Sequence, residues 1–127
     1  MNVPDDRRYL PTHEWHLVDG DVATIGITRH AADELTDITF VELPEVGAEV
    51  KAGEAFGEIE SVKATADLNS GVSGTVVEVN SALKDDPGLV NRDPYHDAWM
   101  IKVRISSRAD VDKLLTPEQY SALLSRQ

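Results

Sequence analysis

Short runs of alternating apolar and polar residues dominate this chain. Five of these runs combine β-branched or aromatic residues with polar ones, and glycine, asparagine and aspartate separate them: residues 22–27, 38–43, 55–60, 75–79 and 99–105. Period-two alternation bounded by turn residues is typical of β-strands. The pattern therefore predicts a mainly β fold, in which two antiparallel sheets pack as a sandwich or flattened barrel.

The segment at residues 38–43 differs from a strand with a single apolar face. Under strict alternation Ile38 and Phe40 fall on one face, and Val41 and Leu43 fall on the other. Strands that are apolar on both faces are typical of a protein interior. We therefore expect this strand to be buried on both sides.

Helix signals are confined to short segments. Thr28 is a suitable N-cap for a helix near residues 28–35. Residues 81–85 can form a single helical turn, which the Asp-Pro-Gly sequence after it should end. A C-terminal helix is expected over residues 116–125, because a threonine, a proline and a glutamine there have the spacing of a capping box: Thr116, Pro117 and Gln119.

Length and charge narrow the class of protein. With 127 residues the chain fits a single domain over residues 1–127, beginning with a polar lead-in at residues 1–8. The formal net charge of −11 argues against nucleic acid and anionic membranes as partners, because both would repel the chain. Basic surfaces on partner proteins are the better expectation.

Cysteine is absent, so any redox sulfur must come from an attached group. No stretch has the apolar length of a membrane span, and the N-terminal residues are too acidic for a transit peptide. We expect a cytoplasmic location, or the mitochondrial matrix if a transit peptide has been removed.

The most informative stretch lies at residues 57–68, with Lys63 near its midpoint. Two short strands joined by a tight turn at residues 61–64 are the natural interpretation. A lysine at a hairpin tip extends its ammonium group into water on a flexible stem, where an enzyme can reach it. Such a lysine is suited to acylation, although composition alone would favour a solubilising turn lysine, because exposed lysine is the default.

The other titratable residues form no recognisable catalytic centre. His13 and His16 are three residues apart and would face opposite sides of a strand, so we expect no metal there. His30 and His96 have no companion cluster in the sequence. No Ser-His-Asp arrangement or phosphate-binding loop is visible, so the chain is expected to be non-catalytic.

Several short motifs follow one another along the chain: His13-Glu14-Trp15, Val22 through Thr28, Phe40 through Pro44, Glu60-Ser61-Val62-Lys63-Ala64, Val72-Ser73-Gly74, Glu78-Val79-Asn80, Leu89-Val90-Asn91, and Asp93-Pro94-Tyr95 followed by Trp99. Taken together, these motifs resemble the H protein of the glycine cleavage system, and the resemblance runs from about Tyr9 to Tyr120. Glu60-Ser61-Val62-Lys63-Ala64 is similar to the family's lipoylation site.

The resemblance implies a lipoyl-carrier fold and a shuttle role in glycine catabolism and one-carbon metabolism. Lipoate, amide-linked to Lys63, would receive an aminomethyl group at glycine decarboxylase (P protein) and present it to aminomethyltransferase (T protein). Dihydrolipoamide dehydrogenase (L protein) would reoxidise the arm, and a lipoate ligase or lipoyl transferase would attach it. Glu60 and Ser61 are expected to contribute to recognition by the ligase, and the chain is expected to be a monomer.

In the family the loaded arm rests in a cleft, where a charged nitrogen should seek carboxylates. Glu14, Glu34 and Asp67 are the expected pocket residues for the aminomethyl arm.

Two positions depart from the family pattern. Glu34 stands where plant-like members have histidine, and Gly71 stands where most members have proline, which is expected to loosen the turn after Ser70.

Three other functions are open at this point. A biotin carrier shares the hairpin, but that family prefers methionine on both sides of its lysine, whereas Val62 and Ala64 flank Lys63. An H-like lipoyl relay protein would hand lipoate to other enzymes. An interaction module would leave the lysine unmodified.

Overall fold

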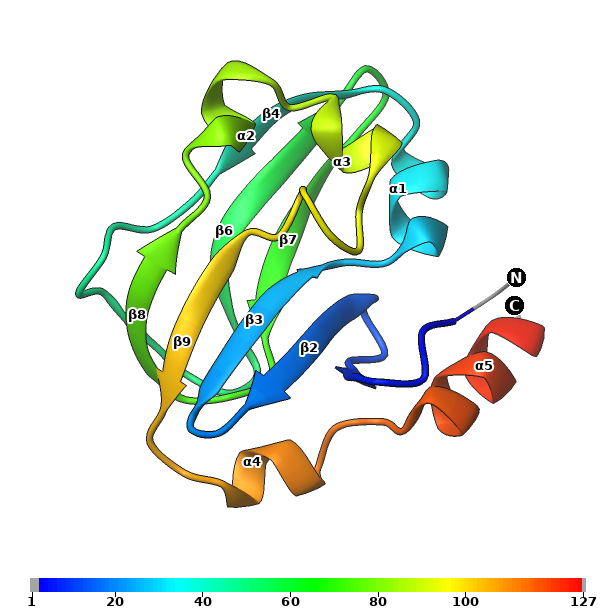
Figure 1. The fold of residues 1–127 in the computed structure, drawn as a ribbon. Coiled ribbons are helices and arrows are strands. Elements are labelled where there is room, and N and C mark those ends of the chain that lie inside the picture. The colour runs from blue at the N-terminus through cyan, green and yellow to red at the C-terminus, as the bar shows by residue number, and fades with distance from the viewer. Residues whose placement is uncertain (1–2, 127) are drawn as a thin grey trace.

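The computed structural model describes residues 3–126, whose strands form two antiparallel sheets (Figure 1). In spatial order the larger sheet contains β1 (Arg8–Tyr9), β2 (Glu14–Asp19), β3 (Val22–Ile27), β9 (Ile101–Ile105), β8 (Gly74–Val79) and β5 (Glu49–Val50). The smaller sheet contains, in spatial order, β4 (Ile38–Glu42), β6 (Glu54–Ser61) and β7 (Thr65–Ser70). The predicted mainly β fold with two antiparallel sheets is confirmed.

Apolar side chains from both sheets meet in one core. Ile25 and Val103 of the larger sheet are fully buried, as are Ile59 and Leu68 of the smaller one. In β9, Val103 points into the core while its neighbour Arg104 is exposed, as expected for period-two alternation. Each such buried aliphatic side chain contributes about 1.5–3 kcal/mol to stability. The core therefore fixes the small sheet, which carries the candidate lysine, against the large one.

The predicted burial of both faces of β4 is wrong. Ile38 and Val41 are buried, but Phe40 is 44% exposed and Thr39 is exposed as well. The pairing of β4 with β6 shifts register between Ile38 and Phe40, and such a bulge interrupts strict alternation. As a result Ile38 and Val41, three residues apart, both contact the core.

Within the described residues 3–126, five short helices connect or follow the strands: α1 (Arg29–Leu35), α2 (Ala82–Asp85), α3 (Leu89–Arg92), α4 (Ala109–Asp112) and α5 (Pro117–Ser125). The predicted cap of α1 is confirmed, because the Thr28 side chain accepts a hydrogen bond from the Ala31 amide. The predicted turn at α2 is also present. The helix α3 was not predicted, because it begins directly after Gly88 and is too short to show a helical period.

The C-terminal helix α5 packs beside the first strands (Figure 1). Its predicted capping box is confirmed: the Thr116 side chain accepts from the Gln119 amide, and the Gln119 side chain accepts from the Thr116 amide. Tyr120 of this helix stacks on Tyr9 with ring centroids 4.5 Å apart. Tyr9 and Leu115 also exchange two backbone hydrogen bonds, so the end of the chain is joined to its beginning. No helix in residues 3–126 is long and apolar enough to cross a membrane.

Candidate functional site

Lys63 lies at the tip of the hairpin formed by β6 and β7, as predicted. Ser61 closes the turn: its amide donates to the Ala64 carbonyl over 2.8 Å. The Ser61 Oγ accepts from the Lys63 amide at 3.3 Å and from the Ala64 amide at 3.1 Å. Lys63 itself is exposed, and its neighbour Val62 is 66% exposed. The turn therefore has a defined backbone and an accessible lysine side chain.

The base of this hairpin is held on several sides. The strand β6 pairs with β4 along one edge and with β7 along the other. Ile59 and Leu68 anchor the two arms in the core, each with 1% exposure. The Val62 amide also donates to the Asp37 carbonyl in the segment after α1, over 3.1 Å. Lys63 is thus presented from a fixed support, in the turn that joins β6 to β7 (Figure 1).

The other four lysines have different settings. Lys51 lies in the connection between β5 and β6, which belong to different sheets. Lys102 contacts Glu78 at 3.1 Å and lies over the Trp99 ring. Lys84 is on the short helix α2, and Lys113 follows α4. Within residues 3–126, Lys63 alone occupies the tip of a hairpin of paired strands.

The two predicted ligase-recognition residues lie at the base of the turn. Glu60 is half-buried in β6 and is paired with Phe40 on one side and Thr65 on the other. Ser61 follows it and holds the turn. Both are therefore within a few residues of Lys63 on the same rigid strand, but Ser61 already has a structural role of its own.

Glu14, the first predicted pocket residue, is buried rather than exposed. Only 1% of its surface is accessible. Its carboxylate accepts hydrogen bonds from the Thr12 hydroxyl at 2.5 Å, the Asn69 amide at 2.8 Å and the Asn69 side-chain amide at 3.2 Å. Burial raises the pKa of Glu14 to about 6, against the opposing effect of these hydrogen bonds. Glu14 thereby joins β2 to β7, the outgoing strand of the lysine hairpin.

The other two predicted pocket residues are exposed. Asp67 lies two residues before Asn69 in β7, so the two side chains share one face of that strand. Because Asn69 contacts Glu14, this face of β7 is the one directed toward Glu14. Glu34 belongs to a different group, since its carboxylate lies 3.2 Å from Nε2 of His30 on α1.

Contrary to the prediction, His30 does have a companion cluster. His13, His30 and Glu34 each place a possible ligand atom within 4.8 Å of the others. His13 lies outside β2 and has a φ of 82°, so the opposite-face argument for a strand does not apply to it. Burial, together with the neighbouring His30, lowers the pKa of His13. Sequence reasoning missed this cluster because its members come from two segments that only the fold brings together.

Gly71 does not loosen the chain after Ser70. It is buried, and its amide donates to Nε2 of His16 over 2.9 Å. Proline has no amide hydrogen, so it could not form this bond. A Cβ atom at position 71 would also overlap the Leu114 side chain. The hydrogen bond to His16 and the close contact with Leu114 therefore both require glycine at position 71.

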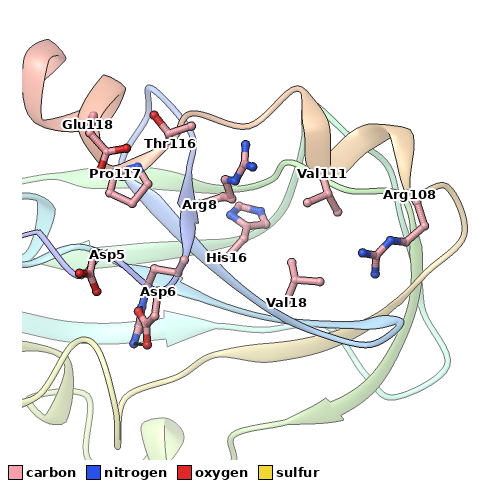
Figure 2. Close-up of a pocket in the computed structure, with 11 residues that line it drawn as sticks. Asp5, Asp6, Arg8, His16, Val18, Arg108, Val111, Thr116, Pro117 and Glu118 are labelled. Atoms are coloured by element: carbon pink, nitrogen blue, oxygen red, sulfur yellow. Dashed lines mark hydrogen bonds and ion pairs between the residues drawn. The ribbon is translucent and has the colours of Figure 1, made fainter.

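His16 also lines a cavity of about 470 Å³, whose lining residues are drawn in Figure 2. Burial lowers the pKa of His16 to about 4, so the ring is neutral near pH 7. The cavity is bordered by charged residues of the N-terminal segment and by the start of α5. Its lining includes none of Lys63, Glu14, Glu34 and Asp67, so it is separate from the predicted site.

A two-sheet β fold that presents one lysine at a hairpin tip defines the class of carrier domains that hold a prosthetic group on a lysine. The pattern of the family described as glycine cleavage H-protein matches residues 7–127. The chain therefore belongs to the glycine cleavage H-protein family.

Individual relatives support the same family membership. The glycine cleavage system H protein of Rubrobacter xylanophilus is 54% identical over 125 residues, which are 98% of this chain and 97% of the relative. The mitochondrial glycine cleavage system H protein of Oryza sativa subsp. indica is 56% identical over 119 residues, 94% of this chain and 73% of the relative. The crystal structure of a glycine cleavage system H protein from Mycobacterium marinum superimposes with a TM-score of 0.89 at 41% identity, covering 97% of this chain and 99% of that one.

This membership supports a lipoyl-carrying shuttle role in glycine cleavage, as the resemblance implied. The chain is a carrier component of that system, and the P, T and L proteins are its partners.

Proposed function

We propose that Lys63 is the residue that carries the lipoyl group, and that the chain has no turnover of its own. The observation that carries this proposal is the position of Lys63 at the tip of a hairpin whose base is fixed on both sides. Acylation needs an accessible amine, and among residues 3–126 no salt bridge holds the Lys63 ammonium. The Lys63 side chain is therefore accessible for attachment of the lipoyl group.

When bound, lipoate supplies a disulfide that can be reduced and a sulfur that can accept a one-carbon unit. The residues of this chain supply the attachment and the tether. Tethering raises the local concentration of a carried group at each partner without any new contact. The rigid hairpin base and the mobile lysine stem together provide a long reach from a defined origin.

The three carboxylates supply a setting for a cationic amine. At pH 7 the Glu14 carboxyl, with a pKa of about 6, is mostly ionised. It is enclosed by Thr12 and Asn69, so its proposed part is to hold β7 and to add negative potential. Exposed Asp67, on the same face of β7 as Asn69, is the carboxylate proposed to contact the amine directly. Glu34 would add charge beside His30.

Enzymes that attach lipoate are proposed to recognise the tip through Glu60 and Ser61. A net charge of −11 favours docking to basic surfaces on such partners. A monomeric state and a cytoplasmic location are further parts of the proposal.

The test is intact-protein mass with peptide mapping, after incubation with lipoate ligase, lipoate and ATP. The native chain should gain one lipoyl increment on Lys63. The Lys63→Arg variant should gain none, while the Lys51→Arg variant, altered at another exposed turn lysine, should behave as the native chain. An increment retained in Lys63→Arg, or absent from the native chain with a competent ligase, would refute the assignment.

A further inference from the structure

Three side chains outside the lysine hairpin gather donor atoms in one place. His13 precedes β2, whereas His30 and Glu34 lie one turn apart on α1. One possible ligand atom from each lies within 4.8 Å of the others. The His13 and His30 rings are 4.6 Å apart between centroids, tilted by 44°. Glu34 is also one of the carboxylates proposed to surround the aminomethyl arm, whereas neither histidine has a part in the proposed role of Lys63.

The Nε2 atom of His30 lacks a hydrogen-bond partner. It is buried, and it lies 3.2 Å from the Glu34 carboxylate without the geometry of a hydrogen bond. No other atom of residues 3–126 bonds to it. A buried polar atom without a partner costs free energy, so such an atom in a folded protein calls for an explanation. A bound cation would supply one.

His13 is held in a fixed orientation by a second layer of residues. Its Nδ1 lies 2.7 Å from the Tyr120 hydroxyl, which lies 2.8 Å from the Thr28 hydroxyl. Tyr120 and Thr28 are both fully buried. If the His13 proton is on Nδ1, it donates to Tyr120, Tyr120 donates to Thr28, and Nε2 is left with a free lone pair. Histidine ligands of metals are characteristically oriented by such a hydrogen bond from the other ring nitrogen.

We propose that His13, His30 and Glu34 form a site for a divalent transition metal of the Zn²⁺ class. Two imidazoles and one carboxylate form a donor set that suits Zn²⁺, whereas Mg²⁺ and Ca²⁺ prefer oxygen ligands throughout. The Glu34 side chain is 61% exposed, so water can reach a remaining coordination position.

The donor atoms need only a modest movement to close on an ion. Ligand atoms about 2.1 Å from a tetrahedral zinc ion lie roughly 3.4 Å from one another. His30 Nε2 and the Glu34 carboxylate are already 3.2 Å apart, so the remaining approach, from at most 4.8 Å to about 3.4 Å, must take place between His13 and this pair. Such an ion would link α1 to the segment before β2 and, through Tyr120, to α5.

The experiment is calorimetric titration of the tag-free, unlipoylated full chain with Zn²⁺, together with visible spectra of the Co²⁺ form. We expect one ion per chain and a Co²⁺ spectrum that shows nitrogen ligation. Glu34→Gln and His30→Asn should each weaken Zn²⁺ binding at least tenfold. Tyr120→Phe should weaken it by about tenfold, because loss of an outer partner typically costs 10–100-fold.

His96→Asn, at an exposed histidine outside the cluster, and Asp33→Asn, beside Glu34, are the matched controls and should bind Zn²⁺ as the native chain does. Absence of stoichiometric binding to the native chain would overturn the proposal. So would binding that Glu34→Gln leaves unchanged, since this exposed substitution should not disturb folding. Lys63→Arg should bind Zn²⁺ normally, so failure of the metal site and failure of the lipoyl assignment are distinguishable.

Discussion

Replacing Glu14 by glutamine should change how the stability of this protein depends on pH. Glutamine has nearly the same shape, and its oxygen can accept the Asn69 hydrogen bonds while its amino group donates to the Thr12 hydroxyl. The substitution therefore removes the ionisable group while retaining the contacts. What differs is the cost of burying a negative charge.

The magnitude follows from the pKa of Glu14. Burial raises it from 4.5 to about 6, a difference of about 1.5, and each pKa unit corresponds to about 1.36 kcal/mol. Because the folded-state pKa is raised, the favourable contribution is fully present below pH 4.5 and is lost as the pH rises through about 6. Ionised Glu14 should therefore cost the native protein about 2 kcal/mol at pH 7 relative to its protonated form.

The assay is urea unfolding of the native chain and the Glu14→Gln variant at several pH values from 4 to 7.5. Other titrating groups are common to both proteins, so they cancel in the difference between the two free energies of unfolding. That difference should move by about 2 kcal/mol in favour of Glu14→Gln as the pH rises. The Glu14→Leu variant should show the same pH trend, displaced by an additional loss of about 1–3 kcal/mol because the Asn69 amide loses its acceptor.

A difference that stays constant across this pH range would refute the reasoning, because Glu14 would then titrate alike in the folded and unfolded chains. A change of the opposite sign would mean that the hydrogen bonds to the carboxylate outweigh its burial.

Substitutions at three other positions test the fold and the hairpin. Gly26→Ala would place a Cβ atom 2.5 Å from Cζ2 of Trp15. It should therefore lower the free energy of unfolding, measured in urea, by about 1–3 kcal/mol. An unchanged midpoint of urea unfolding would show that the Trp15 ring can move aside. Thr116→Ala removes the acceptor for the Gln119 amide and should cost about 1 kcal/mol in the same assay, whereas Thr116→Ser should retain most of the stability. Ser61→Ala removes the acceptor for two turn amides and should slow lipoylation several-fold. The free energy of unfolding should change by no more than about 0.5 kcal/mol, because the turn is exposed. An unaltered lipoylation rate would remove Ser61 from the recognition proposal.

Local features could be predicted from the sequence because they depend on residues close together in the chain. The caps at Thr28 and Thr116 each bond an amide three residues ahead, so the signal and its partner fall in one short window. The hairpin at Lys63 likewise depends on a turn closed by Ser61 and Ala64. Ordered motifs along the chain also predicted the family, which the comparisons confirmed.

The details of β4 could not be predicted in this way. Alternation assumes an uninterrupted strand, but the register shift after Ile38 depends on pairing with β6, about twenty residues further along the chain. Exposure of Phe40 is therefore a property of the sheet and not of the segment.

By itself the sequence determined the class of fold, the two capped helices, the lysine hairpin and the family, because short-range spacing and ordered motifs carry that information. Only the tertiary structure decided that Glu14 is buried against Asn69, that Gly71 is paired with His16, and that His13 meets the α1 pair His30 and Glu34. The first two contacts join residues 55 positions apart. Burial and side-chain direction at such distances depend on how the two sheets and α5 pack together, which no local pattern encodes.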